Sequence, residues 1–336
     1  MKTANRKSSK KVQRSRITKQ SVLKRIIIVL TATILLCTTI LMIAPYIALP
    51  LFLNRHVNYR GYATYDYPLQ DIYYASDYGL NEKQLYLTTE DGYNIWVSEI
   101  YTEKPKAVII YLSGIVQPSV TYFYGHAKFM QDNGYSSILL EVRGHGKSDG
   151  KQICLGYEEV KDVQAVVDYI NSDEKYQGVP IVLQGVSMGG AIAVNSFGQI
   201  NDIDALIAMS AYSSFEDAAL DIMSNYYVPE FIKQIEKPFL RSALHMIFGK
   251  EKVDTLKPLK QIEHANGRPV FLIACKDDKG VPVESTYRLK KAYEEAEIWI
   301  RNSWEHFIVL GCDFKNMAQD TEYCNKILDF LERKLP

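Results

Sequence analysis

The chain has 336 residues, of which 47% are hydrophobic and 23% are charged. This is the composition of an ordinary globular protein, so wholesale disorder, a collagen-like fibre and a disulfide-dense miniprotein are excluded. The formal net charge is zero, but the charges are distributed unevenly along the chain.

Residues 1–25 form a strongly basic tail that contains no acidic side chain. Its basic residues are Lys2, Arg6, Lys7, Lys10, Lys11, Arg14, Arg16, Lys19, Lys24 and Arg25. The rest of the chain holds 29 basic and 39 acidic residues and therefore carries a net charge of −10. A net-acidic body argues against nucleic acid as the main partner.

Residues 26–53 are apolar and contain no charged side chain. As a helix, residues 26–44 would be about 28 Å long, which matches the hydrocarbon core of a bilayer. Pro45 and Pro50 are expected to end or kink this helix near the far interface. The basic tail predicts a cytoplasmic N-terminus, with the chain after residue 54 outside the cytoplasm. The tail could also bind anionic lipid.

Two other interpretations of the apolar segment are a cleaved signal peptide and a buried core helix. A signal peptide has an apolar region of about 7–15 residues that ends in a small-x-small cleavage site. The apolar run here is longer, and Ala44-Pro45-Tyr46 is a poor cleavage site. Length and flanking charge therefore favour an uncleaved membrane anchor at residues 26–53.

Residues 54–80 are rich in tyrosine and show no strong periodicity. We expect a linker that packs on the following domain, in preference to tyrosine rings lying at the level of the lipid headgroups. The tyrosines are Tyr59, Tyr62, Tyr65, Tyr67, Tyr73, Tyr74 and Tyr78.

The remaining residues, 81–336, are expected to form one enzyme domain in which short apolar runs predict strands. Residues 84–89 and 94–100 predict two strands joined by a turn at Glu90-Asp91-Gly92. Uninterrupted apolar runs, which are typical of strands buried on both faces, follow at wider spacing. They lie at residues 107–112, 137–142, 181–184, 205–209, 270–274 and 297–300.

Helical patterns lie between several of these runs, for example in residues 160–170 and 323–331. Strands that alternate with helices indicate an α/β fold, with a mostly parallel sheet flanked by helices. The interval after the run at 205–209 is too long for a simple crossover, so we expect a small helical cap at about residues 212–266. Its apolar side chains either line an acyl-binding pocket or pack the cap onto the sheet.

The sequence GVSMG at residues 185–189 directly follows the apolar run at 181–184. It fits the pattern G-x-S-x-G, in which a serine nucleophile sits at a strand-to-helix turn. Such a serine must project from a tight turn with unusual backbone angles, and the flanking glycines leave room for the close approach of strand and helix. We therefore predict Ser187 as a nucleophile.

A serine nucleophile needs a histidine base and an acid that orients the histidine. In the chain order serine, acid, histidine, the base comes last, and beyond residue 264 the only histidine is His306. The acid should follow the strand predicted at 270–274, where Asp277 and Asp278 both qualify.

An oxyanion hole needs two backbone N–H groups directed at the developing negative charge. Met188, the residue after the nucleophile, is expected to supply one of them. The other is expected from the loop after the run at 107–112, where Gly114 permits a sharp turn and Ile115 offers its N–H.

Together these motifs resemble the α/β-hydrolase superfamily, and above all the serine hydrolases grouped with monoglyceride lipases, lysophospholipases and S33-type serine aminopeptidases. The resemblance covers about residues 80–333. It implies the α/β-hydrolase fold, it implies Asp278 as the acid because the family has the pattern D-x-x-V-P, and it implies a structural role for His145. The motifs are TEDG at 89–92, RGHGKS at 143–148, GVSMGG at 185–190, DKGVP at 278–282, and His306.

The chain departs from the family at two places. The family has His-Gly at the oxyanion loop and often His-Gly before the acid, whereas this chain has Ser113-Gly114 and Ala274-Cys275. Neither departure removes a catalytic group. The serine at position 187 excludes the family branches that use an aspartate nucleophile.

The resemblance and the apolar segment together predict a membrane-anchored serine hydrolase. It would act outside the cytoplasm on a small-molecule or lipid ester, with no cofactor and no metal. An S33-type peptidase or amidase is the alternative, and a catalytically inactive binding protein is a third possibility. The cysteines beyond the anchor lack the spacing of a metal site, and we expect free buried thiols although pairing is possible outside the cytoplasm.

Overall fold

The structure is a computed structural model that describes residues 2–58 and 72–335, with side chains from residue 21 onward. Most side chains of the basic tail and the middle of the predicted linker, including Tyr59, Tyr62, Tyr65 and Tyr67, therefore lie outside the described residues. The chain divides into two compact units, Met1–Ala48 and Leu49–Pro336.

Helix α1, Lys2–Leu53, contains the apolar segment. Its part Ser21–Leu53 has a mean hydropathy of 2.8 and is long and apolar enough to cross a membrane. The helix continues past Pro45 and Pro50 to Leu53, so the expectation that a proline ends it was wrong, while the expected kink stays a prediction. A proline lacks the N–H donor but keeps its carbonyl, and the Pro50 carbonyl accepts a hydrogen bond of 2.9 Å from the Asn54 N–H.

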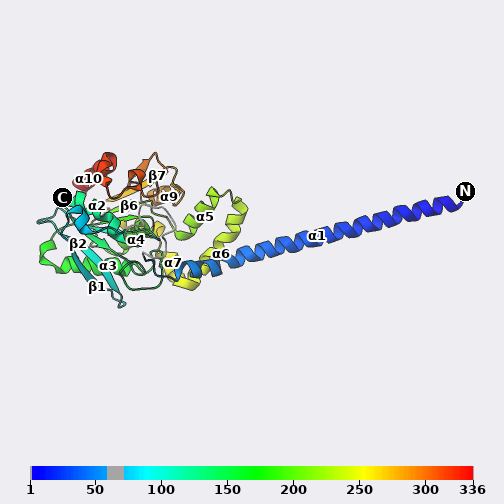
Figure 1. The fold of residues 1–336 in the computed structure, drawn as a ribbon, viewed down its shortest axis with the longest axis horizontal. Coiled ribbons are helices and arrows are strands. Elements are labelled where there is room, and N and C mark those ends of the chain that lie inside the picture. Colours follow the sequence, from blue (N-terminus) through cyan, green and yellow to red (C-terminus); the bar gives the residue numbers. More distant parts are fainter. Residues whose placement is uncertain (1, 59–71, 336) are drawn as a thin grey trace. The chain divides into compact units, whose positions relative to one another are not determined.

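The second unit contains an eight-stranded sheet with the order β1-β2-β4-β3-β5-β6-β7-β8. Figure 1 labels β1, β2, β6 and β7 among these strands. Strand β2 is antiparallel to β1 and β4, and all other neighbouring strands are parallel. The predicted mostly parallel sheet is thereby confirmed. The strands are β1 Lys83–Thr88, β2 Asn94–Ile100, β3 Val108–Leu112, β4 Ser136–Leu140, β5 Ile181–Val186, β6 Ala205–Met209, β7 Val270–Cys275 and β8 Glu297–Arg301.

Helices cover both faces of this sheet because the central strands are apolar on both sides. The buried side chains of α2 and α10 belong to one cluster with Tyr111 on β3, Ile207 on β6 and Phe271 on β7. Helices α3 and α4 contribute no side chain to that cluster, and α4 contacts β3, β5 and β6 from the opposite face. The helices are α2 Tyr124–Asp132, α3 Val160–Ser172, α4 Met188–Gln199, α9 Glu284–Ala292 and α10 Thr321–Lys334.

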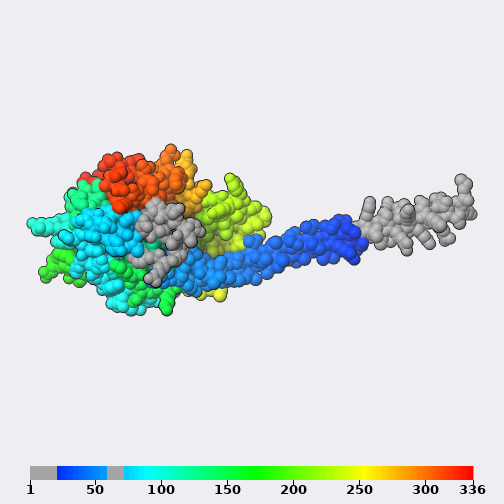
Figure 2. All heavy atoms as spheres, in the orientation of Figure 1, coloured from blue at the N-terminus to red at the C-terminus, as the bar shows by residue number. Residues whose placement is uncertain are grey.

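The interval between β6 and β7 is mostly helical. Figure 2 shows α5 and α6 (yellow-green) as a lobe beside the C-terminal part of the domain (orange and red). The guanidinium of Arg288 on α9 donates to both carboxylate oxygens of Asp221 on α5, at 2.7 and 2.8 Å. The helices are α5 Phe215–Asn225, α6 Glu230–Phe248, α7 Lys250–Thr255 and α8 Pro258–Gln261.

A buried cation joins two of the sequence motifs. The Arg143 guanidinium, in the loop after β4, donates to Asp162 on α3 at 2.7 and 2.9 Å. It also donates to Asp91, in the turn between β1 and β2, at 2.8 and 3.0 Å. These hydrogen bonds hold the pKa of Asp91 well below its usual range. The hairpin turn and the loop after β4 are therefore fixed to one another.

His126 on α2 is a buried, neutral imidazole. It packs against the rings of Tyr111, Phe123, Phe314 and Tyr323, with ring centroids no more than 6.0 Å apart. Its Nε2 lies 3.1 Å from the Tyr323 hydroxyl, and its Nδ1 has no hydrogen-bond partner among the described residues. Complete burial lowers the pKa of His126 to about 3, because the charged form would lose its hydration.

This burial makes the fold sensitive to acid. In the unfolded chain His126 is protonated below pH 6.5, whereas the folded protein resists protonation down to about pH 3. The unfolded state therefore binds more protons in this window, and stability falls as the pH falls from 6.5. When the pH is lowered from 7 to 5, the free energy of unfolding should therefore decrease in the wild type. In His126→Phe we expect this decrease to be smaller by roughly 2 kcal/mol.

Urea unfolding of the full chain in detergent micelles at the two pH values measures this difference. Comparing each protein with itself at the other pH removes any constant packing effect of the phenyl ring. Equal losses in the two proteins would show that His126 does not titrate on unfolding.

Candidate active site

Ser187 lies at the sharp turn between β5 and α4. Its backbone angles are φ 59° and ψ −122°, in a region that residues with a side chain seldom adopt. The Ser187 N–H donates a hydrogen bond of 2.9 Å to the carbonyl of Met209, the last residue of β6. The turn therefore places Ser187 at the carboxyl edge of the sheet and at the N-terminus of α4.

The two glycines of the motif allow this turn to form. A Cβ at Gly185 would lie 2.2 Å from the Gly189 carbonyl oxygen. A Cβ at Gly189 would lie 2.3 Å from the Leu112 carbonyl oxygen and 2.5 Å from that of Ser113. Because backbone atoms occupy both places, only glycine fits. The contacts also show that the loop after β3 passes directly against the turn.

Asp278 and His306 form a close pair at the same edge. Asp278 follows β7, and its buried carboxylate lies 2.8 and 3.0 Å from Nδ1 of His306. The same carboxylate accepts hydrogen bonds from the backbone N–H groups of Gly280, at 2.7 Å, and Val281, at 3.2 Å. Of the two candidate acids, Asp278 contacts the histidine, whereas the neighbouring Asp277 is exposed.

His306 lies in the loop after β8 and is held through its backbone. Its carbonyl accepts a hydrogen bond of 2.7 Å from the Ser210 hydroxyl. Ser210 directly follows Met209, which binds the Ser187 N–H, so a single dipeptide links the serine turn and the histidine loop. Among the described residues, no hydrogen bond joins Ser187 Oγ to the imidazole.

The loop after β3 carries the predicted backbone donors. The Gly114 N–H donates to the Tyr122 hydroxyl at 3.3 Å, and a Cβ at Gly114 would lie 3.4 Å from Ser187 Cβ. The Ile115 carbonyl lies 3.1 Å from Nε2 of His145. Within the part of the chain that the structure describes, the N–H groups of Ile115 and Met188 have no acceptor. For Met188 this follows from its place in the first turn of α4.

Sequence reasoning missed the groups that hold this arrangement. Ser210 fixes the histidine loop and Tyr122 fixes the oxyanion loop, yet neither belongs to a recognisable motif. His145 was expected to have a structural role, and its Nε2 contacts the Ile115 carbonyl beside the candidate site. Across the described ranges 21–58 and 72–335, no group of three or more His, Cys, Asp or Glu side chains is arranged to hold a metal ion.

Comparisons with known proteins agree with this architecture. Residues 103–237 match the family described as serine aminopeptidase, S33. The uncharacterized protein YqkD of Bacillus subtilis strain 168 is 27% identical over 220 residues, which cover 64% of this chain and 70% of YqkD. Phospholipase ABHD3 of Mus musculus is 24% identical over 199 residues, which cover 55% of this chain and 47% of the phospholipase.

A solved structure with the same fold is the esterase PF2001 of Pyrococcus furiosus. The two structures superpose with a TM-score of 0.61 over 79% of this chain and 95% of the esterase, at 22% sequence identity. The chain therefore has the α/β-hydrolase fold, and its residues 103–237 are similar to the serine aminopeptidases described as S33.

Proposed function

We propose that the chain is a serine hydrolase that cleaves an acyl or lipid ester, with Ser187 as nucleophile, His306 as base and Asp278 as orienting acid. The observation that carries the proposal is the hydrogen bond of 2.8 Å between the buried Asp278 carboxylate and His306 Nδ1, at the sheet edge that also carries the strained serine turn. Nucleophile, base and orienting group are the parts that this chemistry needs.

The reaction follows from the hydrogen bonds. Asp278 accepts from Nδ1–H of His306, which leaves Nε2 as the nitrogen that can accept a proton. Ser187 Oγ attacks the ester carbonyl while its proton moves to Nε2, and the imidazolium then protonates the leaving alcohol. A water molecule, activated by the same nitrogen, releases the acyl group. Catalytic hydrogen bonds are often long without substrate, so the bond from Ser187 to His306 is expected to form in the complex.

The unpaired amides support an oxyanion hole. The N–H groups of Ile115 and Met188 belong to two segments that meet at Ser187, and among the described residues neither donates a hydrogen bond. Two such donors would stabilise the negative oxygen of the tetrahedral intermediate, and removing one typically raises the barrier by about 2.7–4 kcal/mol.

An ester substrate is the first candidate, because two of the similar proteins are described as an esterase and a phospholipase. Glu305, which precedes the proposed base, accepts hydrogen bonds from the Ser303 hydroxyl and from the Gly311 N–H at 2.7 Å, so this carboxylate already has protein partners. The S33 family name keeps the peptidase as the second candidate.

We also propose that residues 26–53 anchor the enzyme in a membrane, with residues 1–25 as a basic cytoplasmic tail and the hydrolase domain outside the cytoplasm. The length and hydropathy of Ser21–Leu53 support a membrane span. The excess of basic residues before the span supports the orientation. A mature protein that begins downstream of residue 44 would overturn this anchor.

Replacing the nucleophile gives the most direct test. A fluorophosphonate probe should label the wild-type full chain at Ser187, because the probe needs an activated hydroxyl. Ser187→Ala should lose both the labelling and the hydrolysis of p-nitrophenyl acyl esters. Hydrolysis by folded Ser187→Ala at the wild-type rate would refute the mechanism.

Two adjacent aspartates provide a matched pair for the acid. Asp278→Asn should lower kcat by roughly three to four orders of magnitude, because an amide at this place stabilises the wrong tautomer of the histidine. Asp277→Asn makes the same chemical change at the neighbouring exposed carboxylate. It should leave kcat within about twofold of the wild-type value. Steady-state kinetics on one acyl ester measures both variants, and similar losses in the two would contradict the assignment.

A substrate panel separates the two candidate activities. We expect the wild-type chain to hydrolyse acyl esters of varied length with a higher kcat/KM than aminoacyl amides of matched leaving group. The ratio of the two kcat/KM values is the measurement, and Ser187→Ala supplies the background rate for each substrate. A higher value for the aminoacyl amides would instead establish the peptidase.

A further inference from the structure

The segment at the end of α1 binds the loop after β4. We call residues 53–57 the strap and residues 143–150 the RGHG loop. The Val57 N–H donates to the Gly144 carbonyl at 2.7 Å, and the Gly146 N–H donates to the Val57 carbonyl at 2.9 Å. These bonds form a parallel β-bridge between Val57 and His145. The side chains of Leu53 and Val57 are completely buried, so the strap is packed onto the hydrolase domain.

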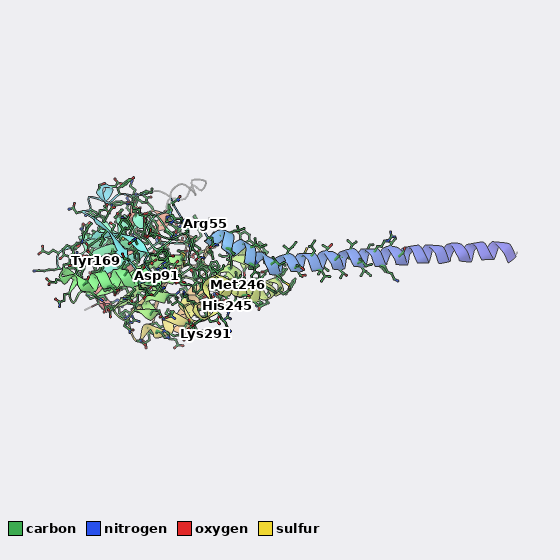
Figure 3. The ribbon with its side chains drawn as sticks, turned by 90° about the horizontal axis from the view of Figure 1, so that it is seen from below. Arg55, Asp91, Tyr169, His245, Met246 and Lys291 are labelled. Atoms are coloured by element: carbon green, nitrogen blue, oxygen red, sulfur yellow. The ribbon has the colours of Figure 1, made fainter. Side chains whose placement is uncertain are left out.

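His56 clamps this contact. Its Nδ1 lies 2.8 Å from the Gly150 carbonyl oxygen and its Nε2 lies 2.9 Å from the Gly146 carbonyl oxygen. Carbonyl oxygens can only accept hydrogen bonds, so the ring nitrogens of His56 face two acceptors, Gly146 and Gly150, within the same loop. Figure 3 labels the neighbouring Arg55, whose guanidinium lies 4.4 Å from the ring centroid of Phe52.

A buried carboxylate also contacts the RGHG loop. Glu141 is 1% exposed and accepts hydrogen bonds from the Lys147 N–H and, at 2.5 Å, from the Ser119 hydroxyl. Burial raises the pKa of Glu141, and the hydrogen bonds from the Lys147 N–H and the Ser119 hydroxyl act against this rise. Ser119 lies in the segment that continues from the proposed oxyanion loop, so Glu141 ties that segment to the RGHG loop.

The RGHG loop also touches the proposed oxyanion hole directly. His145 is 1% exposed, and its two ring nitrogens lie 3.1 Å from the Ile115 carbonyl oxygen and 3.2 Å from that of Arg143. Ile115 is the residue whose N–H is proposed to bind the oxyanion. The Ile115 carbonyl therefore contacts the same loop to which the strap is hydrogen-bonded.

We propose that the strap positions the oxyanion hole, with His56 as the positioning residue that links the segment following the apolar helix to catalysis. This inference rests on the proposed function, because it assigns the strap a role in that reaction. When the clamp is lost, the RGHG loop and the Ile115 backbone gain freedom. Transition-state stabilisation then weakens, while the contacts that bind the ground-state substrate stay in place.

The test compares variants at one position in the full chain, in detergent micelles. His56→Leu removes both ring nitrogens that face the two carbonyl groups. His56→Gln keeps an amide group that can donate a hydrogen bond to one of them. We expect His56→Leu to lower kcat about tenfold, which is less than the decrease caused by removing an oxyanion donor itself. The KM should stay within about twofold of the wild-type value. His56→Gln should recover at least part of the loss. His264→Ala, at an exposed histidine on η5, Ile262–Ala265, is the matched control and should keep the wild-type kcat.

Active-site titration with a fluorophosphonate keeps folding and catalysis apart, because kcat is then expressed per labelled Ser187. Should leucine at position 56 prevent folding, His56→Asn, whose shorter amide reaches one carbonyl at most, takes its place with an intermediate kcat expected. A wild-type kcat per labelled site in the donor-free variant would overturn the inference. The inference would also be overturned if His56→Leu and His56→Gln lost kcat equally and the loss paralleled the decrease in their unfolding midpoints.

The same experiment distinguishes the two proposals. If the wild-type chain is not labelled at Ser187, the proposed function fails, and the role of the strap fails with it. If the wild-type chain is labelled and active but His56→Leu has the same kcat and KM, only the role of the strap fails.

Discussion

The close approach of two backbone segments at the carboxyl edge of the sheet controls the geometry of the site. The turn at Ser187 can form only with glycine at positions 185 and 189, because a Cβ atom there would lie 2.2 or 2.3 Å from a backbone carbonyl oxygen. A positive φ at Ser187 is unfavourable in isolation. It persists because β5 and α4 are fixed by burial and because the Ser187 N–H is bound to the end of β6. The orientation of the Ser187 side chain is thus set by the packing of β5, α4 and β6 around the turn.

The other groups of the site come from loops at the same edge, and each loop is held by polar contacts with a different neighbour. Ser210 holds the histidine loop, Tyr122 holds the loop after β3, and Asn225 at the end of α5 donates to the Lys279 carbonyl at 3.1 Å, next to Asp278. Parallel strands bring such loops together because their carboxyl ends meet at one edge. A fold with this edge can therefore assemble a site from residues that are more than a hundred positions apart.

Much of the fold could be predicted because its cause is local. Uninterrupted apolar runs identified the strands, and the errors were at the ends: β5 continues to Val186, since Gly185 still pairs with Leu112 and Ala208 although glycine adds nothing to an apolar run. The part of the prediction in which Pro45 or Pro50 ends the helix was wrong, because α1 continues past both residues to Leu53.

The residues of the candidate site could be predicted only where they belong to a recognisable sequence motif. The pattern around Ser187 and the position of His306 follow from the chain, whereas the choice between Asp277 and Asp278 needed a family pattern, because both follow the same strand. The contacts of the strap with the RGHG loop join residues about ninety positions apart. Such pairs cannot be predicted from periodicity or motif spacing, because a histidine that binds two backbone carbonyl groups has no sequence signature.

The ion network around Arg143 has a consequence for how this sequence can diverge. Its two carboxylate partners lie on separate elements, and Asp162 is completely buried. Losing one member of a buried ion pair leaves an unmatched charge that costs about 3–5 kcal/mol, whereas exchanging the whole group for apolar residues can be nearly neutral. A single substitution at position 143 or 162 is therefore expected to destabilise the fold more than a concerted apolar replacement of Asp91, Arg143 and Asp162.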